Sequence, residues 1–180
     1  MKAVFLDRDG VINEDRADYV KNVAELKIFS YVPDAVRRLN DAGFKVYVVS
    51  NQQGVAKGLI REENLMDIQA EIAGQVEAAG GNISKFYYCR HMASEKCSCR
   101  KPEPGLLLSA ACEHGIGLDE SYMIGDTQRD IIAGKTAGCK TILVLSGLLT
   151  PQEIERFECK PDFTATNLSK AVDYIINSAR

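Results

Sequence analysis

Short apolar segments alternate with longer amphipathic segments along most of this sequence. The short segments are rich in β-branched and aromatic residues and end at polar or turn-forming residues, which is typical of buried parallel strands. On this basis we expect strands at residues 3–6, 45–49, 86–88, 122–124 and 141–145.

Between these strands, apolar residues recur at helical spacing. We expect helices at residues 33–42, 62–79, 104–114, 127–137 and 167–178. Pro33 and Pro104 suit the first turns of two helices, and Gly43, Gly80 and Gly115 suit helix ends. Strands that alternate with helices predict an α/β fold, a doubly wound parallel sheet with helices on both faces.

Composition narrows the class of protein without naming a function. Apolar residues make up 46% of 180 residues, which is enough for one compact domain over residues 1–180. The net charge is only −3 with acids and bases interleaved, so we expect no nucleic-acid partner. No apolar stretch approaches the roughly 20 residues of a membrane span. Charged residues from Asp7 onward would break a secretory signal core, so we expect a cytoplasmic protein. We also expect a monomer with an open site, because the sequence leaves no room for a cap domain.

The most informative stretch is Asp7-Arg8-Asp9-Gly10, which follows the first expected strand. Two acids at positions i and i+2 of an extended segment point to the same side. Close carboxylates repel each other and favour a divalent cation such as Mg²⁺. One carboxylate could then attack a phosphoryl group while the other moves protons. The alternative interpretation is a solvated loop of acidic and basic residues.

Three further polar segments strengthen the catalytic interpretation. Ser50 and Asn51 follow the second strand and could hold phosphoryl oxygens with a hydroxyl and turn amides. Lys101 precedes an expected helix, where it could neutralise phosphate charge. Asp126 follows another strand and suits a metal ligand, and Asp130, one turn later, could orient a neighbouring group. In a parallel sheet the strand ends meet at one edge, where such sites form.

These four segments resemble the motifs of haloacid dehalogenase-like (HAD) phosphatases over about residues 2–147. The resemblance implies that Asp7 is a nucleophile that forms an aspartyl-phosphate and that Asp9 is the general acid and base. It implies that Ser50 and Lys101 hold the phosphoryl group. It also implies catalytic Mg²⁺ bound by Asp7, Asp126 and the main-chain carbonyl of Asp9.

A compact cluster of metal-ligating residue types lies just before Lys101. Cys89, His91, Cys97 and Cys99 supply three thiolates and one imidazole, a full tetrahedral set for structural Zn²⁺. A loop of reduced thiols, or a labile pair of Cys97 and Cys99, remains the alternative. A bound ion would fix the cations that directly follow this loop toward the active site.

The Cys-x-His and Cys-x-Cys-Arg-Lys-Pro pattern resembles the zinc-containing HAD branch. That branch holds D-glycero-D-manno-heptose 1,7-bisphosphate phosphatases and histidinol-phosphate phosphatases. Segments 50–58 and 100–105 are closer to the heptose enzymes, whose likeness implies that Arg100 recognises substrate and that residues 15–19 contact the sugar. The five-residue spacer before Cys97 is instead short, as in the histidinol-phosphate branch, and Thr127 stands where heptose enzymes can have Lys.

The expected activity is therefore Mg²⁺-dependent removal of a phosphate from a small anionic sugar phosphate. The first candidate reaction is removal of the C7 phosphate of heptose 1,7-bisphosphate, and the alternative substrate is histidinol phosphate. A third possibility is a non-catalytic zinc or redox module on a phosphatase scaffold. The intervals between Asp9 and Ser50 and between Asn51 and Lys101 leave no room for a separate cap domain. Lys57 and Arg61 are candidates for a basic rim, with Arg100. The residues assign no function to the segment after Pro151.

Overall fold

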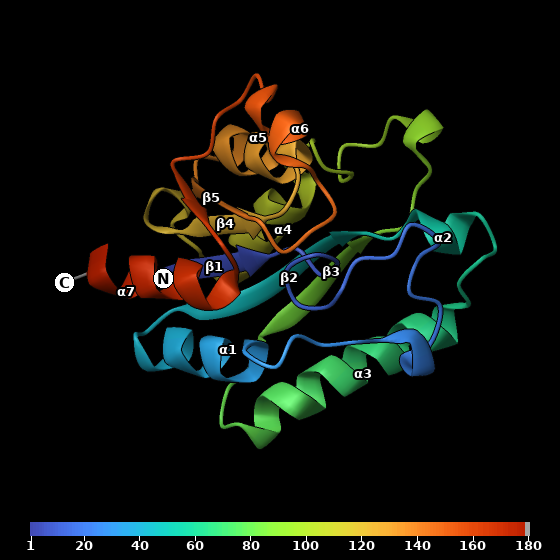
Figure 1. The fold of residues 1–180 in the computed structure, drawn as a ribbon, viewed down its shortest axis with the longest axis horizontal. Coiled ribbons are helices and arrows are strands. Elements are labelled where there is room, and N and C mark those ends of the chain that lie inside the picture. Colours follow the sequence, from blue (N-terminus) through green and yellow to red (C-terminus); the bar gives the residue numbers. More distant parts are fainter. Residues whose placement is uncertain (179–180) are drawn as a thin grey trace.

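The structure, a computed structural model that describes residues 1–178, contains one six-stranded parallel sheet (Figure 1). Its strands follow the order β3-β2-β1-β4-β5-β6. The bounds are β1 Ala3–Leu6, β2 Lys45–Asn51, β3 Lys85–Cys89, β4 Tyr122–Gly125, β5 Lys140–Val144 and β6 Phe163–Ala165. This architecture confirms the predicted doubly wound α/β fold.

Helices cover both faces of the sheet (Figure 1). One face carries α1 (Val32–Asp41), α3 (Glu62–Ala78) and α7 (Leu168–Ser178), and the other carries α4 (Gly105–His114) and α5 (Gln128–Ala137). Two short helices complete the fold: α2 (Gln53–Ala56) lies between β2 and α3, and α6 (Pro151–Glu155) lies between β5 and β6. Two apolar layers result, one on each side of the sheet.

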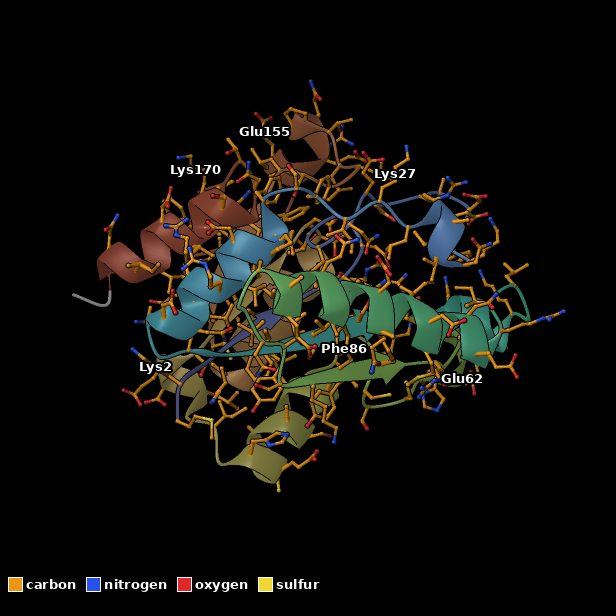
Figure 2. All side chains as sticks on the ribbon, turned by 90° about the horizontal axis from the view of Figure 1, so that it is seen from below. Lys2, Lys27, Glu62, Phe86, Glu155 and Lys170 are labelled. Carbon is orange, nitrogen blue, oxygen red and sulfur yellow. The ribbon has the colours of Figure 1, made fainter. Side chains whose placement is uncertain are left out.

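The apolar residues of these segments recur at helical spacing, so a helix places them on one face that can pack against the sheet. In α1, Val32, Ala35, Val36 and Leu39 are buried, which places one apolar stripe against the sheet. Figure 2, seen from the side of α3, shows this helix running alongside β3. At 17 residues α3 is the longest described helix, and none of the helices in residues 1–178 is both long and apolar enough to cross a bilayer.

The predicted boundaries of the long elements agree with the structure to within one or two residues. The clearest extension is β2, which continues through Ser50 and Asn51, where we expected a turn. The pattern missed α2, α6 and β6 because each is short and, unlike the equally short β1, contains no uninterrupted apolar run. The segment after Pro151 supplies the edge strand β6, which pairs with β5, and then α7, which packs on α1.

The order of the strands decides where a site can form. β1 pairs with β2 on one side and with β4 on the other, so the chain passes from β1 outward to β2 and β3 and then returns past β1 to β4. Leu6, the last residue of β1, lies opposite Ile124 of β4. Residues just beyond these two strand ends therefore come together at the crevice where open α/β sheets bind ligands.

We expect Leu39→Ala to reduce the free energy of unfolding by about 3 kcal/mol, because it leaves a cavity in a fully buried layer. The matched control is Leu148→Ala, which removes the same atoms from a side chain that is 60% exposed and should cost less than about 0.5 kcal/mol. Urea denaturation measures both. Equal losses in the two variants would contradict the assignment of α1 to the core.

Candidate active site

Asp7, Asp126, Asp130 and Lys101 come together beyond the ends of β1 and β4. Carboxylate oxygens of Asp7, Asp126 and Asp130 lie within 4.8 Å of one another. Lys101 is 2% exposed, and its Nζ lies 3.0 Å from Asp7 Oδ1 and 2.6 Å from Asp130 Oδ1. Two of these acids, Asp7 and Asp130, thus share one buried cation, and Asp126 lies beside them.

The electrostatics of this cluster are unbalanced in favour of negative charge. Burial, assisted by repulsion from Asp130 and Asp9, raises the pKa of Asp7 to about 6 despite the attraction of Lys101. Burial and the charges of Asp130 and Asp7 raise the pKa of Asp126 to about 9. Burial also acts against ionisation of Asp130, but the adjacent Lys101 prevails and lowers its pKa. Asp126 has no paired cation among residues 1–178, so it and Asp7 are suited to a divalent cation.

Asp9 is held in its ionised form by its own set of donors. Arg8 donates from Nη2 to both Asp9 oxygens at 2.9 Å, Asn13 donates at 2.9 Å and Gln52 donates at 3.0 Å. Burial opposes ionisation, but Arg8 and these hydrogen bonds prevail and lower the pKa of Asp9. Both oxygens of the Asp9 carboxylate therefore accept hydrogen bonds, while 24% of the side chain remains exposed.

Asn51 and Thr127 each hydrogen-bond to one member of the Lys101–Asp130 pair and so help to position it. The amide of Asn51 accepts from Lys101 N at 3.0 Å and donates to Lys101 O at 2.9 Å, which ties the end of β2 to the lysine backbone. The Thr127 hydroxyl donates to Asp130 Oδ2 at 2.6 Å, and its main-chain N–H donates to the same oxygen at 3.0 Å. Asn51 thus fixes the Lys101 main chain, and Thr127 fixes the carboxylate that pairs with Lys101.

Some residues of the site were not found from the sequence. Gly10, with φ of +78°, and Gly147 both pack so closely on Asp126 that a Cβ at either position would collide with its carboxyl group. Ser146 donates to Gly10 O at 2.6 Å, which joins the loop after β5 to the loop after β1. Gln52 is buried and bridges Ser50 and Asp9. Gly10 and Gln52 carried a signal, because Gly10 ends the Asp7-Arg8-Asp9-Gly10 stretch and Gln52 directly follows the predicted Ser50–Asn51 pair, whereas Ser146 and Gly147 carried none.

A cleft of about 260 Å³ opens above these groups. It is lined by Asp7, Asp9, Asp15, Arg16, Ala17, Tyr19, Ser50, Asn51, Gln53, Arg100, Lys101, Asp126, Thr127, Arg129 and Asp130. The loop at residues 15–19 thus forms part of the mouth, as expected. Neither Lys57 nor Arg61 lines the cleft, and Lys57 instead donates to the Tyr19 hydroxyl at 2.9 Å.

Cys89, His91, Cys97 and Cys99 form a second cluster beside the cleft. The three sulfur–sulfur distances are 3.2 Å to 3.5 Å, and His91 Nδ1 lies 3.3 Å from Cys99 Sγ and 3.5 Å from Cys89 Sγ. A Zn–S bond of about 2.3 Å gives a tetrahedral edge of roughly 3.8 Å, close to these separations. The four ligand atoms therefore fit around one tetrahedral metal ion.

Comparisons with known proteins agree with this geometry. A family model described as HAD-hydrolase-like matches residues 98–171. A D-glycero-beta-D-manno-heptose-1,7-bisphosphate 7-phosphatase of Neisseria meningitidis serogroup A is 39% identical over 82% of this chain and 79% of that protein. The protein of that name from Helicobacter pylori strain J99 is 35% identical over 97% of each chain.

Solved structures extend the likeness to the whole fold. A D,D-heptose 1,7-bisphosphate phosphatase from B. bronchiseptica, crystallised with magnesium and phosphate, superposes with a TM-score of 0.91 at 29% identity and covers 99% of both chains. A D,D-heptose 1,7-bisphosphate phosphatase from Burkholderia thailandensis has a TM-score of 0.73 at 25% identity, covering 97% of this chain and 99% of that one.

The raised pKa values of Asp7 and Asp126 predict how Mg²⁺ stabilises the protein. Without metal, the folded state binds more protons than the unfolded state, so the free energy of unfolding falls as pH rises through about 6 and about 9. A cation bound to both carboxylates removes this penalty. The Mg²⁺-induced rise in Tm should therefore be larger at about pH 8 than at about pH 6.

Differential scanning fluorimetry with and without MgCl₂ measures this effect. Asp126→Asn should abolish most of the Mg²⁺ shift and stabilise the metal-free protein at alkaline pH, whereas Asp41→Asn, an exposed acid on α1, should change neither. A Mg²⁺ shift that is the same at both pH values would contradict the proposed pair of ligands.

Proposed function

Because the chain belongs to the family of D-glycero-β-D-manno-heptose-1,7-bisphosphate 7-phosphatases, we propose that it removes the C7 phosphate of that bisphosphate through an aspartyl-phosphate on Asp7. The enzyme is a phosphoric monoester hydrolase with a HAD-like fold. The proposed β-anomer follows the names of the relatives.

One observation supports the proposed chemistry more than any other. Lys101 is buried between Asp7 and Asp130, with its ammonium 3.0 Å from Asp7 Oδ1. A phosphoryl group that approaches the free oxygen of Asp7 therefore meets a fixed positive charge. Such charges stabilise the equatorial oxygens in phosphoryl transfer because they need no reorganisation as the reaction proceeds.

Asp7 acts first, by attack of a carboxylate oxygen on phosphorus. A new P–O bond forms to Asp7 while the bond to the C7 oxygen of the sugar breaks, and Asp9 protonates that oxygen. The Arg8 main-chain N–H donates to Asp7 Oδ1 at 2.7 Å and, with Lys101, fixes one oxygen so that the other faces the cleft. The Ser50 hydroxyl lines the same cleft and binds a phosphoryl oxygen.

Asp9 acts again when water hydrolyses the aspartyl-phosphate. It takes a proton from the water as the water oxygen attacks phosphorus, which releases inorganic phosphate and restores the Asp7 carboxylate. Arg8, Asn13 and Gln52 lower the pKa of Asp9 and so favour its ionised carboxylate, which is the form that accepts a proton in this second step. The first step requires that Asp9 has gained its proton before the sugar leaves.

We assign Mg²⁺ to Asp7, Asp126 and the main-chain carbonyl of Asp9. The raised pKa values of Asp7 and Asp126, and the contact of Gly10 and Gly147 with Asp126, support this assignment. When bound, the cation neutralises the crowded acids and withdraws charge from the phosphoryl oxygens. The close packing of Gly10 and Gly147 against the Asp126 carboxyl group restrains the position of that side chain.

We assign structural Zn²⁺ to Cys89, His91, Cys97 and Cys99. No position is left for water in a site with four protein ligands, which is typical of structural zinc. The next residue, Arg100, donates to the main-chain oxygen of His91 at 3.3 Å and to Gln53 Oε1 at 3.3 Å. The ion therefore holds the loop that presents Arg100 and Lys101 to the cleft.

The substrate is tested by comparing kcat/KM for both anomers of heptose 1,7-bisphosphate with kcat/KM for histidinol phosphate, which the short spacer before Cys97 still favours. We expect the β-anomer of the bisphosphate to be preferred. Asp7→Asn should lower kcat on it by about 10³-fold or more, since no other group replaces the nucleophile.

Asp41→Asn serves as the matched control and should leave kcat unchanged. A preference for histidinol phosphate would overturn the substrate proposed here but not the chemistry. Full turnover by folded Asp7→Asn would overturn the chemistry itself.

Metal analysis of the purified protein should give about one zinc per chain, as expected for a single Cys₃His site. Cys99→Ser should lose the ion and raise KM by about tenfold, with a smaller change in kcat, because the loop positions charge and breaks no bond. Cys112→Ser removes an exposed thiol outside the cluster and should keep both zinc and KM. A folded wild-type chain free of transition metal would show that these residues form no zinc site.

A further inference from the structure

Arg129 lies at the border between the active-site cleft and a second, larger hollow. It is the second residue of α5, directly after the Asp126–Thr127 turn. The second hollow has a volume of about 660 Å³ and shares Arg100, Lys101 and Arg129 with the first. Because Lys101 is buried between its two aspartates, Arg100 and Arg129 are the cations that face both spaces.

The two hollows differ sharply in charge. The active-site cleft contains five aspartates and four basic residues. The second hollow is lined by four basic residues, among them Lys96, and by a single acid, Glu103. An anion long enough to occupy both spaces thus has one end in the acidic cleft, where a metal ion is needed, and the other end in the basic hollow.

Arg129 forms no salt bridge within the part of the chain that the structure describes, although its charge acts on Asp15, which lines the same cleft. The side chain is exposed. Arg100 likewise forms no ion pair among residues 1–178 and donates only to two neutral oxygens, at 3.3 Å each. Two guanidinium groups at one border keep donors available for an anion, and guanidinium binds phosphate in a planar, two-point manner.

We propose that Arg129, together with Arg100, binds the phosphate that is not transferred and so determines the preference for bisphosphates. This inference rests on the proposed function. The phosphate to be cleaved lies at Asp7, and the sugar carries the second phosphate at its other end, toward the border with the basic hollow. Arg129 then contributes a charged contact that a monophosphate cannot make.

The test compares kcat/KM for heptose 1,7-bisphosphate and heptose 7-phosphate, which present the same scissile phosphate. Two charge-assisted hydrogen bonds predict that Arg129→Gln loses about ten- to a hundredfold more on the bisphosphate than on the monophosphate. Arg129→Lys, which keeps the charge, should recover part of the ratio. Arg156→Gln, an exposed arginine that lines neither hollow, is the matched control and should keep the wild-type ratio.

The outcomes separate this inference from the proposed function. If the wild type prefers the bisphosphate and Arg129→Gln keeps that preference, the function stands and the inference is wrong. If the wild type ignores heptose substrates but prefers fructose 1,6-bisphosphate over fructose 6-phosphate, and Arg129→Gln loses that preference, the inference stands without the proposed substrate. A wild type with no preference for any of these bisphosphates would overturn the inference.

Discussion

The burial of Lys101 between Asp7 and Asp130 is the interaction on which the site depends. An ammonium that is 2% exposed requires negative partners, and Asp7 and Asp130 supply them at 3.0 Å and 2.6 Å. The arrangement leaves Asp126 without its own cation among residues 1–178, and burial raises its pKa to about 9. The same cluster therefore creates both a fixed positive charge for a phosphoryl group and a demand for a divalent cation.

The rest of the architecture keeps these groups in place. The reversal of strand order at β1 brings Asp7 beside Asp126, and the start of α5 places Asp130 under Lys101. Asn51 ties the lysine backbone to the end of β2 through two hydrogen bonds. The Cys/His loop ends directly before Arg100, so that the metal site we propose there would support the basic side of the cleft.

Much of this arrangement could be predicted from the sequence, because it depends on local pattern and on strand ends. Buried strands that end in Asp7 and Asp126 must place those acids at one edge, and the structure brings them together as expected. The contacts of Gly147 with Asp126, and the position of Arg129 between two hollows, depend on segments that meet only in three dimensions. The three-residue β6 is too short to show a period. The hydrogen bonds between Asn51 and the Lys101 backbone could not be predicted because the two residues are 50 positions apart, and substrate binding by Asn51 stays a prediction.

Covalent catalysis at the end of β1 is the central step of the proposed mechanism. Acid quenching during turnover of a phosphate-labelled substrate, followed by peptide mapping, locates any trapped intermediate. We predict a phosphoryl group on the carboxylate of Asp7 that is released by hydroxylamine. Label on a different side chain, or a protein that turns over substrate and never acquires label, would contradict it.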